Sequence, residues 1–249
     1  MCLLNTKTLR VQEFFTYIPC YAILSHTWEG AEEVTFQDIQ NITTLADTCD
    51  GRQLTFDDIR AHLPPVQLKK GYTKVVQACV CAWSSTFEWI WIDSCCINKE
   101  SSAELSEAIN SMYQYYENTI VCYVYLFDVS AKYHPKNPES DFKDSKWFTR
   151  GWTLQELLAP EFIVFFDKDW TKIGTRWSLR DLISLVNTIP INLLEGRPID
   201  KCSVAQKMLW AVYRQTTRPE DKAYCLMGIF GVSMSPILGK GATASHGKL

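Results

Sequence analysis

The sequence predicts an α/β protein, in which a parallel sheet flanked by helices is followed by a helical annex. Short apolar runs alternate with amphipathic stretches of helical period. The runs are apolar almost throughout, which is typical of strands buried on both faces of a parallel sheet. With 47% apolar residues among 249, the chain can bury a core of domain size. We expect one domain over residues 1–235, with the sheet over about 20–168 and the annex over about 170–235.

The elements of the sheet region follow from the period of the apolar residues. Four strands are expected, each ending at a polar loop, over residues 21–24, 88–92, 119–127 and 161–166. Helical spacing predicts helices over 71–85 and 104–116 and a third that ends near Leu158, before Pro160. Because the carboxyl ends of parallel strands meet at one edge of a sheet, the polar residues that follow these strands are candidate site residues.

The annex is expected to contain three helices. Ser178 is interpreted as the N-cap of a helix over 179–186, and Ser203 as the N-cap of a helix over 204–214. The third helix is expected over 218–230, with a proline in its first turn. Residues 236–249 show no periodicity and are expected to form a disordered tail.

Charge and cysteine content disfavour several classes of protein. Lys plus Arg is 25 and Asp plus Glu is 28, without a basic stripe, so nucleic-acid binding is not expected. No apolar run approaches the roughly 20 residues of a membrane span, and the N-terminus does not resemble a signal peptide, so we expect a cytoplasmic protein. The ten cysteines lie mostly in apolar runs without C-x2-C spacing, which predicts reduced core thiols and no metal site.

Four blocks of the sequence resemble the fungal heterokaryon incompatibility (HET) domain. They are YAILSHTWEGAEEVTFQDI (21–39), WIWIDSCCINKESSAELSEAINSMYQYYENT (89–119), WFTRGWTLQELLAP (147–160) and TTRPEDKAYCLMGIFGV (216–232). The resemblance covers about residues 1–235 in the order of the family. It implies an effector of allorecognition and cell death when fungal cells of unlike genotype fuse. It also implies self-association, and NLR-type or other incompatibility proteins as partners.

HET domains are in turn similar to TIR domains, which have a flavodoxin-like parallel sheet and in several branches hydrolyse NAD. The stretch from Ile23 to His26 matches the strand and loop that open a TIR domain. Ser145, followed by Trp152-Thr-Leu-Gln-Glu156-Leu157, matches a later helix. The glutamate of that motif is essential in catalytic TIR domains. The resemblance therefore implies a TIR/flavodoxin-like fold, with Glu156 as the catalytic residue.

The chemistry of NAD cleavage is compatible with one carboxylate. The nicotinamide–ribose bond breaks through an oxocarbenium-like transition state, and the leaving group is a cationic pyridinium that needs no proton. Ser25, His26, Trp28, Asp93 and Trp152 are predicted to bind this substrate, the two tryptophans against its rings. NAD is expected as a substrate, and no cofactor is predicted, because neither a G-x-G-x-x-G turn nor a P-loop occurs.

Each of these assignments has a structural alternative. Thr153-Leu-Gln-Glu156 is also a capping box, in which the glutamate would only bind the backbone. Asp93 could bind ribose, pair with an arginine or cap the next turn, and His26 could orient its loop. A thiol nucleophile at Cys95 or Cys96, with His26 as its base, lacks an orienting third group.

Alternatives also remain for the function of the whole chain. One is a non-enzymatic signalling module that acts by oligomerising with partners. Another is an inactive, truncated paralogue, because the family block ending in CINQ ends here in Lys99 and the sequence stops soon after the last block. Arg150 and Arg218 could contact a pyrophosphate, although Arg218 also resembles a helix start.

Overall fold

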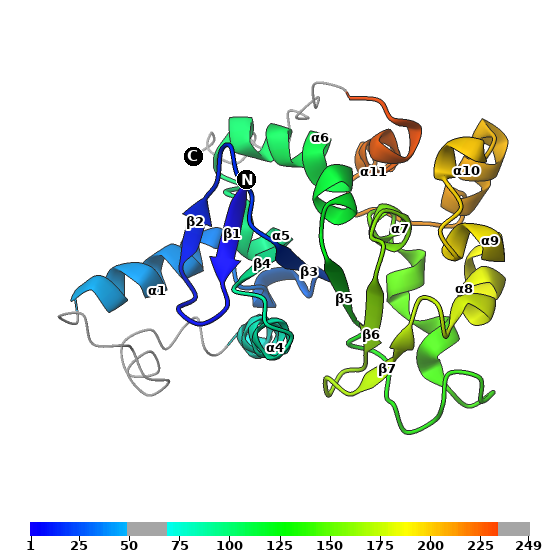
Figure 1. Cartoon of the computed structure of the whole chain (residues 1–249), viewed down its shortest axis with the longest axis horizontal. Helices are drawn as coiled ribbons and strands as arrows, with labels where there is room; N and C mark the ends of the chain where they lie inside the picture. The colour runs from blue at the N-terminus through cyan, green and yellow to red at the C-terminus, as the bar shows by residue number, and fades with distance from the viewer. Residues whose placement is uncertain (49–68, 234–249) are drawn as a thin grey trace, which may run out of the picture.

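The computed structural model describes residues 1–48 and 69–233. Its described strands form one seven-stranded sheet in the order β2-β1-β4-β3-β5-β6-β7 (Figure 1). The four central strands are parallel to one another: β4 (Trp89–Ile92), β3 (Tyr21–His26), β5 (Val121–Tyr125) and β6 (Ile163–Phe166). In chain order these four strands lie 2-1-3-4, which is the flavodoxin-like arrangement. The predicted TIR/flavodoxin-like α/β fold is confirmed.

Three short strands extend the sheet beyond its predicted limits. β1 (Cys2–Asn5) pairs antiparallel with β4, β2 (Val11–Glu13) pairs antiparallel with β1, and β7 (Lys172–Thr175) pairs antiparallel with β6. The expected sheet range of about 20–168 was therefore too narrow, and the annex is not purely helical. Strands of three or four residues are too short to show a reliable alternation, which is why the sequence did not predict them.

Helices flank the central strands. Around the N-terminal half lie α1 (Phe36–Thr48), α4 (Lys70–Ser84) and the short α5 (Asp93–Cys96), while α6 (Ser102–Glu117), α7 (Thr153–Leu158) and α11 (Asp221–Phe230) pack against one another. The remaining helices are α8 (Arg180–Asn187), α9 (Ile191–Leu194) and α10 (Val204–Ala211). Four 3-10 helices complete the described elements: η1 (Gly30–Glu32), η2 (Asp141–Asp144), η3 (Lys146–Thr149) and η4 (Ile199–Lys201). None of the helices in these ranges is long and apolar enough to cross a bilayer.

The predicted caps had different outcomes. Ser203 forms a complete capping box with Gln206 at the start of α10, as expected. Ser178 does not cap α8, because the N-cap is Leu179 and the Ser178 hydroxyl instead accepts a hydrogen bond from the Thr175 backbone at 2.9 Å. The third annex helix starts at Asp221, later than predicted. The expected tail over 236–249 lies outside the described residues.

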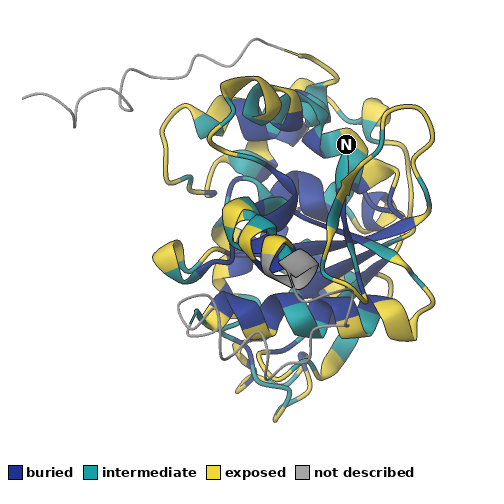
Figure 2. Cartoon of the chain, turned by 90° about the vertical axis from the view of Figure 1, so that its left-hand side faces the viewer, coloured by how far each residue is buried: buried dark blue, intermediate teal, exposed yellow. Residues whose placement is uncertain are grey.

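The core is centred on the parallel strands. Every residue of β3 is buried, and Figure 2 shows the strong burial of the sheet between exposed helix surfaces. The nine cysteines in the described ranges are free thiols, as predicted, and five of them are buried. In α11, a Cβ on Gly228 would collide with the Tyr113 side chain of α6. Glycine at this position therefore allows the two helices to pack closely.

Candidate functional site

The candidate site lies where the order of the sheet reverses. From β3 the chain continues to β4 on one side of it and later to β5 on the other side. In open α/β sheets, ligands bind outside the carboxyl ends of the strands at such a point. Ser25 and His26 are the last two residues of β3. Because neighbouring residues of a strand point to opposite faces, they define a serine side and a histidine side of the site.

On the serine side, three parts of the chain meet at one hydroxyl group. Ser25 is fully buried, and its Oγ donates a hydrogen bond to Glu156 Oε2 in α7. The same Oγ accepts a hydrogen bond from the Trp147 indole Nε1 at 2.8 Å. The Tyr116 hydroxyl of α6 donates to the Leu24 carbonyl at 3.3 Å and also interacts with Glu156. The predicted catalytic residue thus lies against the predicted Ser25.

The Glu156 carboxyl is a much weaker acid than an ordinary glutamate. Glu156 is 5% exposed, and burial raises its pKa to about 8. The hydrogen bond from Ser25 acts in the opposite direction. Nearby Asp93 adds to the increase, whereas Tyr116 and Arg214 oppose it. A carboxyl with such a pKa holds its proton at neutral pH and can exchange it near physiological pH.

The capping alternative for Glu156 is wrong. Helix α7 does begin at Thr153, but the Thr153 hydroxyl donates to the backbone carbonyls of Trp147 and Arg150, at 2.5 and 2.9 Å. The N-cap residue, Trp152, makes no side-chain capping bond. Since the carboxylate accepts from Ser25 instead, a tertiary contact across the sheet edge replaces the capping box.

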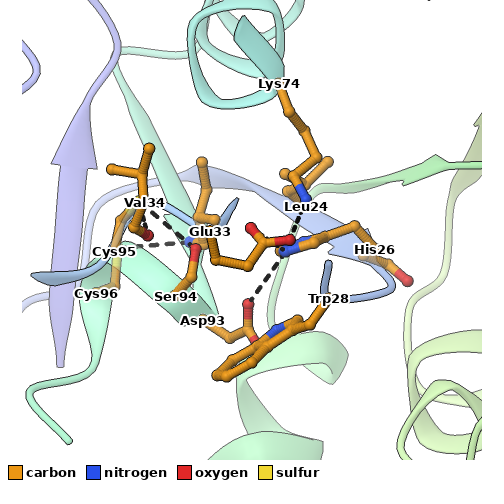
Figure 3. Close-up of polar contacts among 12 residues, drawn as sticks. Leu24, His26, Trp28, Glu33, Val34, Lys74, Asp93, Ser94, Cys95 and Cys96 are labelled. Atoms are coloured by element: carbon orange, nitrogen blue, oxygen red, sulfur yellow. Dashed lines mark hydrogen bonds and ion pairs between the residues drawn. The ribbon is translucent and has the colours of Figure 1, made fainter. Parts of the chain in front are cut away.

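The histidine side contains a second buried carboxylate. His26 Nε2 lies 3.5 Å from Glu33 Oε2 and 3.8 Å from Asp93 Oδ1 (Figure 3). Lys74 of α4 reaches the other Glu33 oxygen at 2.5 Å. Burial favours the neutral form of Glu33, but contacts with His26 and then Lys74 outweigh it and lower the pKa of Glu33 to about 2. This carboxylate is ionised and held by cationic or polar partners.

Trp28 and Asp93 lie at the outer edge of the histidine side. The Trp28 Nε1 donates to Asp93 Oδ2 at 2.8 Å, and the indole is 43% exposed. Lys99 Nζ lies 3.2 Å from the centroid of the Trp28 ring. Asp93 thus binds an indole, and neither an arginine pair nor a side-chain cap is seen at α5. The Lys99 departure from the family pattern falls directly on a predicted substrate-binding ring.

Several polar atoms on this side have no hydrogen-bond partner within residues 1–48 and 69–233. They are both ring nitrogens of His26, Thr27 Oγ1, Glu33 Oε2 and Asp93 Oδ1, all of them buried. Buried polar atoms without partners are costly, and functional sites commonly retain them to bind a ligand. His26 Nε2, Glu33 Oε2 and Asp93 Oδ1 meet only one another, at 3.5–3.8 Å, so His26 Nδ1 and Thr27 Oγ1 are the groups most available to a polar substrate.

Within the described residues, Trp152 makes no hydrogen bond to the other predicted residues. Its indole Nε1 donates to Asp221 Oδ2 of α11 at 3.2 Å. Arg150 contacts the Thr217 hydroxyl at 3.2 Å, which gives it a structural partner in the loop before α11. Cys95 and Cys96 are both buried, and burial raises the pKa of each thiol, that of Cys95 to about 12. Burial thus argues further against the alternative of a thiol nucleophile, because little thiolate would form at neutral pH.

Sequence reasoning missed several residues of the site. Glu33 and Lys74 were not singled out, because their pairing joins segments about 40 residues apart. Trp147 was noted only as a tryptophan of the third block. The sequence could have indicated Trp147, because a buried indole N–H usually needs a hydrogen-bond acceptor. Here that acceptor is Ser25 Oγ. Arg214, whose charge acts on Glu156, also gave no sequence signal.

A parallel sheet in the order 2-1-3-4, with the buried Ser25–Glu156 pair at its switch point, defines an α/β domain with a TIR/flavodoxin-like fold. Residues 21–139 match the model of the family described as heterokaryon incompatibility protein (HET). The chain is also 42% identical over 229 residues to vegetative incompatibility protein HET-E-1 of Podospora anserina. The chain therefore belongs to the HET family.

The match spans most of this chain but only a small part of the relative. It covers 90% of this chain but 15% of the length of HET-E-1. No solved structure matches the chain. The family assignment therefore rests on sequence comparison.

Proposed function

We propose that this HET domain acts in heterokaryon incompatibility by hydrolysing NAD at the nicotinamide–ribose bond, with Glu156 as the catalytic carboxyl. The similarity to a protein named for vegetative incompatibility supports the biological role. The buried Ser25–Glu156 pair at the carboxyl end of β3 is the single observation that supports the chemistry. We further propose that the domain acts in the cytoplasm on self-association, alone or with NLR-type partners.

The reaction can be written with its atoms balanced. The bond between ribose C1′ and the pyridinium nitrogen breaks, and its electron pair leaves with nicotinamide. Water adds to C1′ and loses a proton, so the products are nicotinamide, ADP-ribose and a proton. An ionised Glu156 would stabilise the positive charge on the ribose or take the proton from water. Since the pKa of Glu156 is about 8, the rate should rise from pH 6 to pH 8.

The other predicted residues receive supporting roles in this proposal. Ser25 positions the Glu156 carboxylate through their hydrogen bond. His26 and Asp93 offer unpartnered polar atoms to the ribose hydroxyl groups, and the half-exposed Trp28 offers a ring face once Lys99 moves aside. Trp152 would contact the substrate only if its indole gave up the hydrogen bond to Asp221. It therefore needs a larger rearrangement than the other predicted residues.

Nicotinamide release by the purified protein tests the proposal. Wild type, Glu156→Gln and Glu156→Ala are incubated with NAD, with and without a crowding agent, and light scattering establishes the assembly state. A matched control is Glu161→Gln, at an exposed glutamate just after α7. We expect the Glu156 variants to lose about 10²–10⁴-fold in rate, the range for removing an acid–base group, and the control to retain it.

Two outcomes would overturn parts of this account. If the assembled wild type releases no nicotinamide, the enzymatic proposal fails. If it turns over NAD and the Glu156 variants do so equally well, the reaction stands but the residue assignment fails.

The exposed side of α10 favours a second candidate, a module that signals by oligomerisation without catalysis. Apolar side chains there are exposed by 46–66%, namely Met208, Leu209, Val212 and Val204. Exposed apolar patches of this kind commonly mark interaction sites. The two candidates are separated in cells, because Glu156→Gln should abolish incompatibility if catalysis is required and preserve it if assembly is sufficient.

A further inference from the structure

A pocket of about 490 Å³ opens between α10 and α11, apart from the Ser25–Glu156 pair. These two helices are the last two of the described sequence, and Figure 1 shows them beside each other. The walls are mainly apolar and consist of Met208, Ala211, Val212, Ala223, Leu226 and Phe230. Pockets of about 300–1,000 Å³ with apolar walls and a few polar groups are typical of small-molecule sites.

The charged residues of this pocket are all cationic. Among the described residues that line it, Arg214 and Lys222 carry charge and none is acidic. Lys222 is exposed at the rim, whereas Arg214 is 6% exposed. An anion in the pocket would therefore meet one buried and one exposed positive charge.

The buried Arg214 lacks a direct anionic partner. Its guanidinium donates to the Arg150 carbonyl and to Thr153 Oγ1, both at 2.9 Å, and to Asn187 Oδ1. All three acceptors are neutral, and no carboxylate in the described ranges forms an ion pair with it. Burial lowers the pKa of Arg214 to about 10, which still leaves it charged at neutral pH. Glu156 acts on this charge without an ion pair, and because its pKa is about 8 it is mostly neutral at pH 7, so Arg214 has no full counter-ion there.

We propose that this pocket binds an apolar monocarboxylate, such as a medium-chain fatty acid. The carboxylate lies towards Arg214 and Lys222, and the acyl chain lies along the apolar walls of α10 and α11. The complementarity between a single negative charge and the two cations favours this ligand over a neutral lipid or a cationic amphiphile. None of the predicted substrate-binding residues lines the pocket, which is joined to the NAD site only through the charge of Arg214 acting on Glu156.

Titration calorimetry with decanoate tests the proposal, and decanol serves as a ligand of the same chain length without charge. We expect one decanoate to bind per chain, at least about tenfold more tightly than decanol, a difference of about 1.4 kcal/mol. Ala223→Phe, at an exposed position in the lining, should fill the pocket and abolish binding. Lys222→Gln should weaken decanoate binding several-fold, and Lys201→Gln, at an exposed lysine outside the pocket, should not.

Other outcomes would overturn the proposal. Equal binding of decanoate and decanol, or of neither, would exclude a site selected by charge. Undiminished binding to Ala223→Phe, once its circular dichroism and melting temperature match wild type, would place the ligand elsewhere. If Ala223→Phe instead dissociates a ligand-free dimer seen by sedimentation, a second copy of the chain is the natural occupant of this groove.

Discussion

Two buried glutamates lie on either side of β3 and differ in protonation. Glu33 is 4% exposed and Glu156 is 5% exposed, so burial raises the pKa of both. Glu33 contacts His26 and Lys74, which lower its pKa to about 2 overall. Glu156 accepts from the neutral Ser25, and its pKa is raised to about 8. Both side chains are inaccessible to solvent, but Glu156 is the more deeply buried and lacks a contact with a cation, and both differences favour its neutral form.

The contrast distinguishes a carboxylate in a buried ion pair from the carboxyl that we propose to be catalytic. An ion pair such as Glu33–Lys74 fixes η1 and the following loop against α4 and keeps its charge at all physiological pH values. A carboxyl that exchanges its proton near pH 8 is of the kind found in catalytic sites.

Breaking the buried ion pair should have the largest effect. Lys74→Met leaves the Glu33 charge without its lysine, and we expect the free energy of unfolding to fall by about 3–5 kcal/mol. Urea denaturation measures this loss. The control is Lys69→Met, which breaks the more exposed pair with Asp38 and should cost about 0.2–1 kcal/mol. Equal losses in the two variants would contradict the claim that the buried Glu33–Lys74 pair contributes more to stability than the Asp38–Lys69 pair.

The pH dependence of stability should differ between wild type and Glu156→Gln. Because the folded-state pKa of Glu156 is raised from 4.5 to about 8, the folded protein holds a proton that the unfolded chain has lost between these values. Its contribution to stability is complete below about pH 4.5 and declines as the pH rises to 8, by up to about 1.4 kcal/mol per pH unit. Denaturation curves at each pH should show this slope in wild type and not in Glu156→Gln.

The contribution of Glu33 to stability should change with pH in the opposite direction, which provides an internal control. Its folded-state pKa is lowered to about 2, so its contribution is present above about pH 4.5 and is lost as the pH falls towards 2. A slope between pH 5 and pH 8 that persisted in Glu156→Gln would have to come from another group, and our assignment would be wrong.

Trp147→Phe should have an intermediate effect on the serine side. The change removes the indole donor to Ser25 and keeps an aromatic ring beside Phe148 and Phe165. We expect a loss of about 1–3 kcal/mol in the free energy of unfolding. The exposed Trp177 is the matched control, and Trp177→Phe should change stability by about 0.5 kcal/mol or less. An unchanged stability in Trp147→Phe would mean that the indole does not hold Ser25.

Lys99→Gln should have the smallest effect on stability. The ammonium group lies over the partly exposed Trp28 ring, and such contacts contribute about 0.5–1 kcal/mol. Chemical denaturation should detect at most this loss, while quenching of tryptophan fluorescence by acrylamide should increase as the Trp28 face opens. A loss well above about 1 kcal/mol would show that Lys99 stabilises the fold through more than its contact with the Trp28 ring.

The sequence predicted those features that depend on local periodicity or on a short motif. Buried apolar runs predicted the four parallel strands and placed Ser25 at the end of one of them, whereas Glu156 was singled out by the resemblance to a TIR motif. It could not predict the Glu33–Lys74 pair, because that contact depends on how α4 packs beside η1. Ser178 failed as a cap because it accepts a turn hydrogen bond from the Thr175 backbone, and the sequence likewise gave no sign that the Trp152 indole donates to Asp221.

The most direct test of the two-glutamate contrast is a carbon-13 NMR titration of the side-chain carboxyl groups, with Glu156→Gln and Glu33→Gln assigning the two resonances. We predict that the Glu156 carboxyl titrates near pH 8 and that the Glu33 carboxylate stays ionised down to about pH 2. Titration of both groups near their ordinary value of 4.5 would contradict the account.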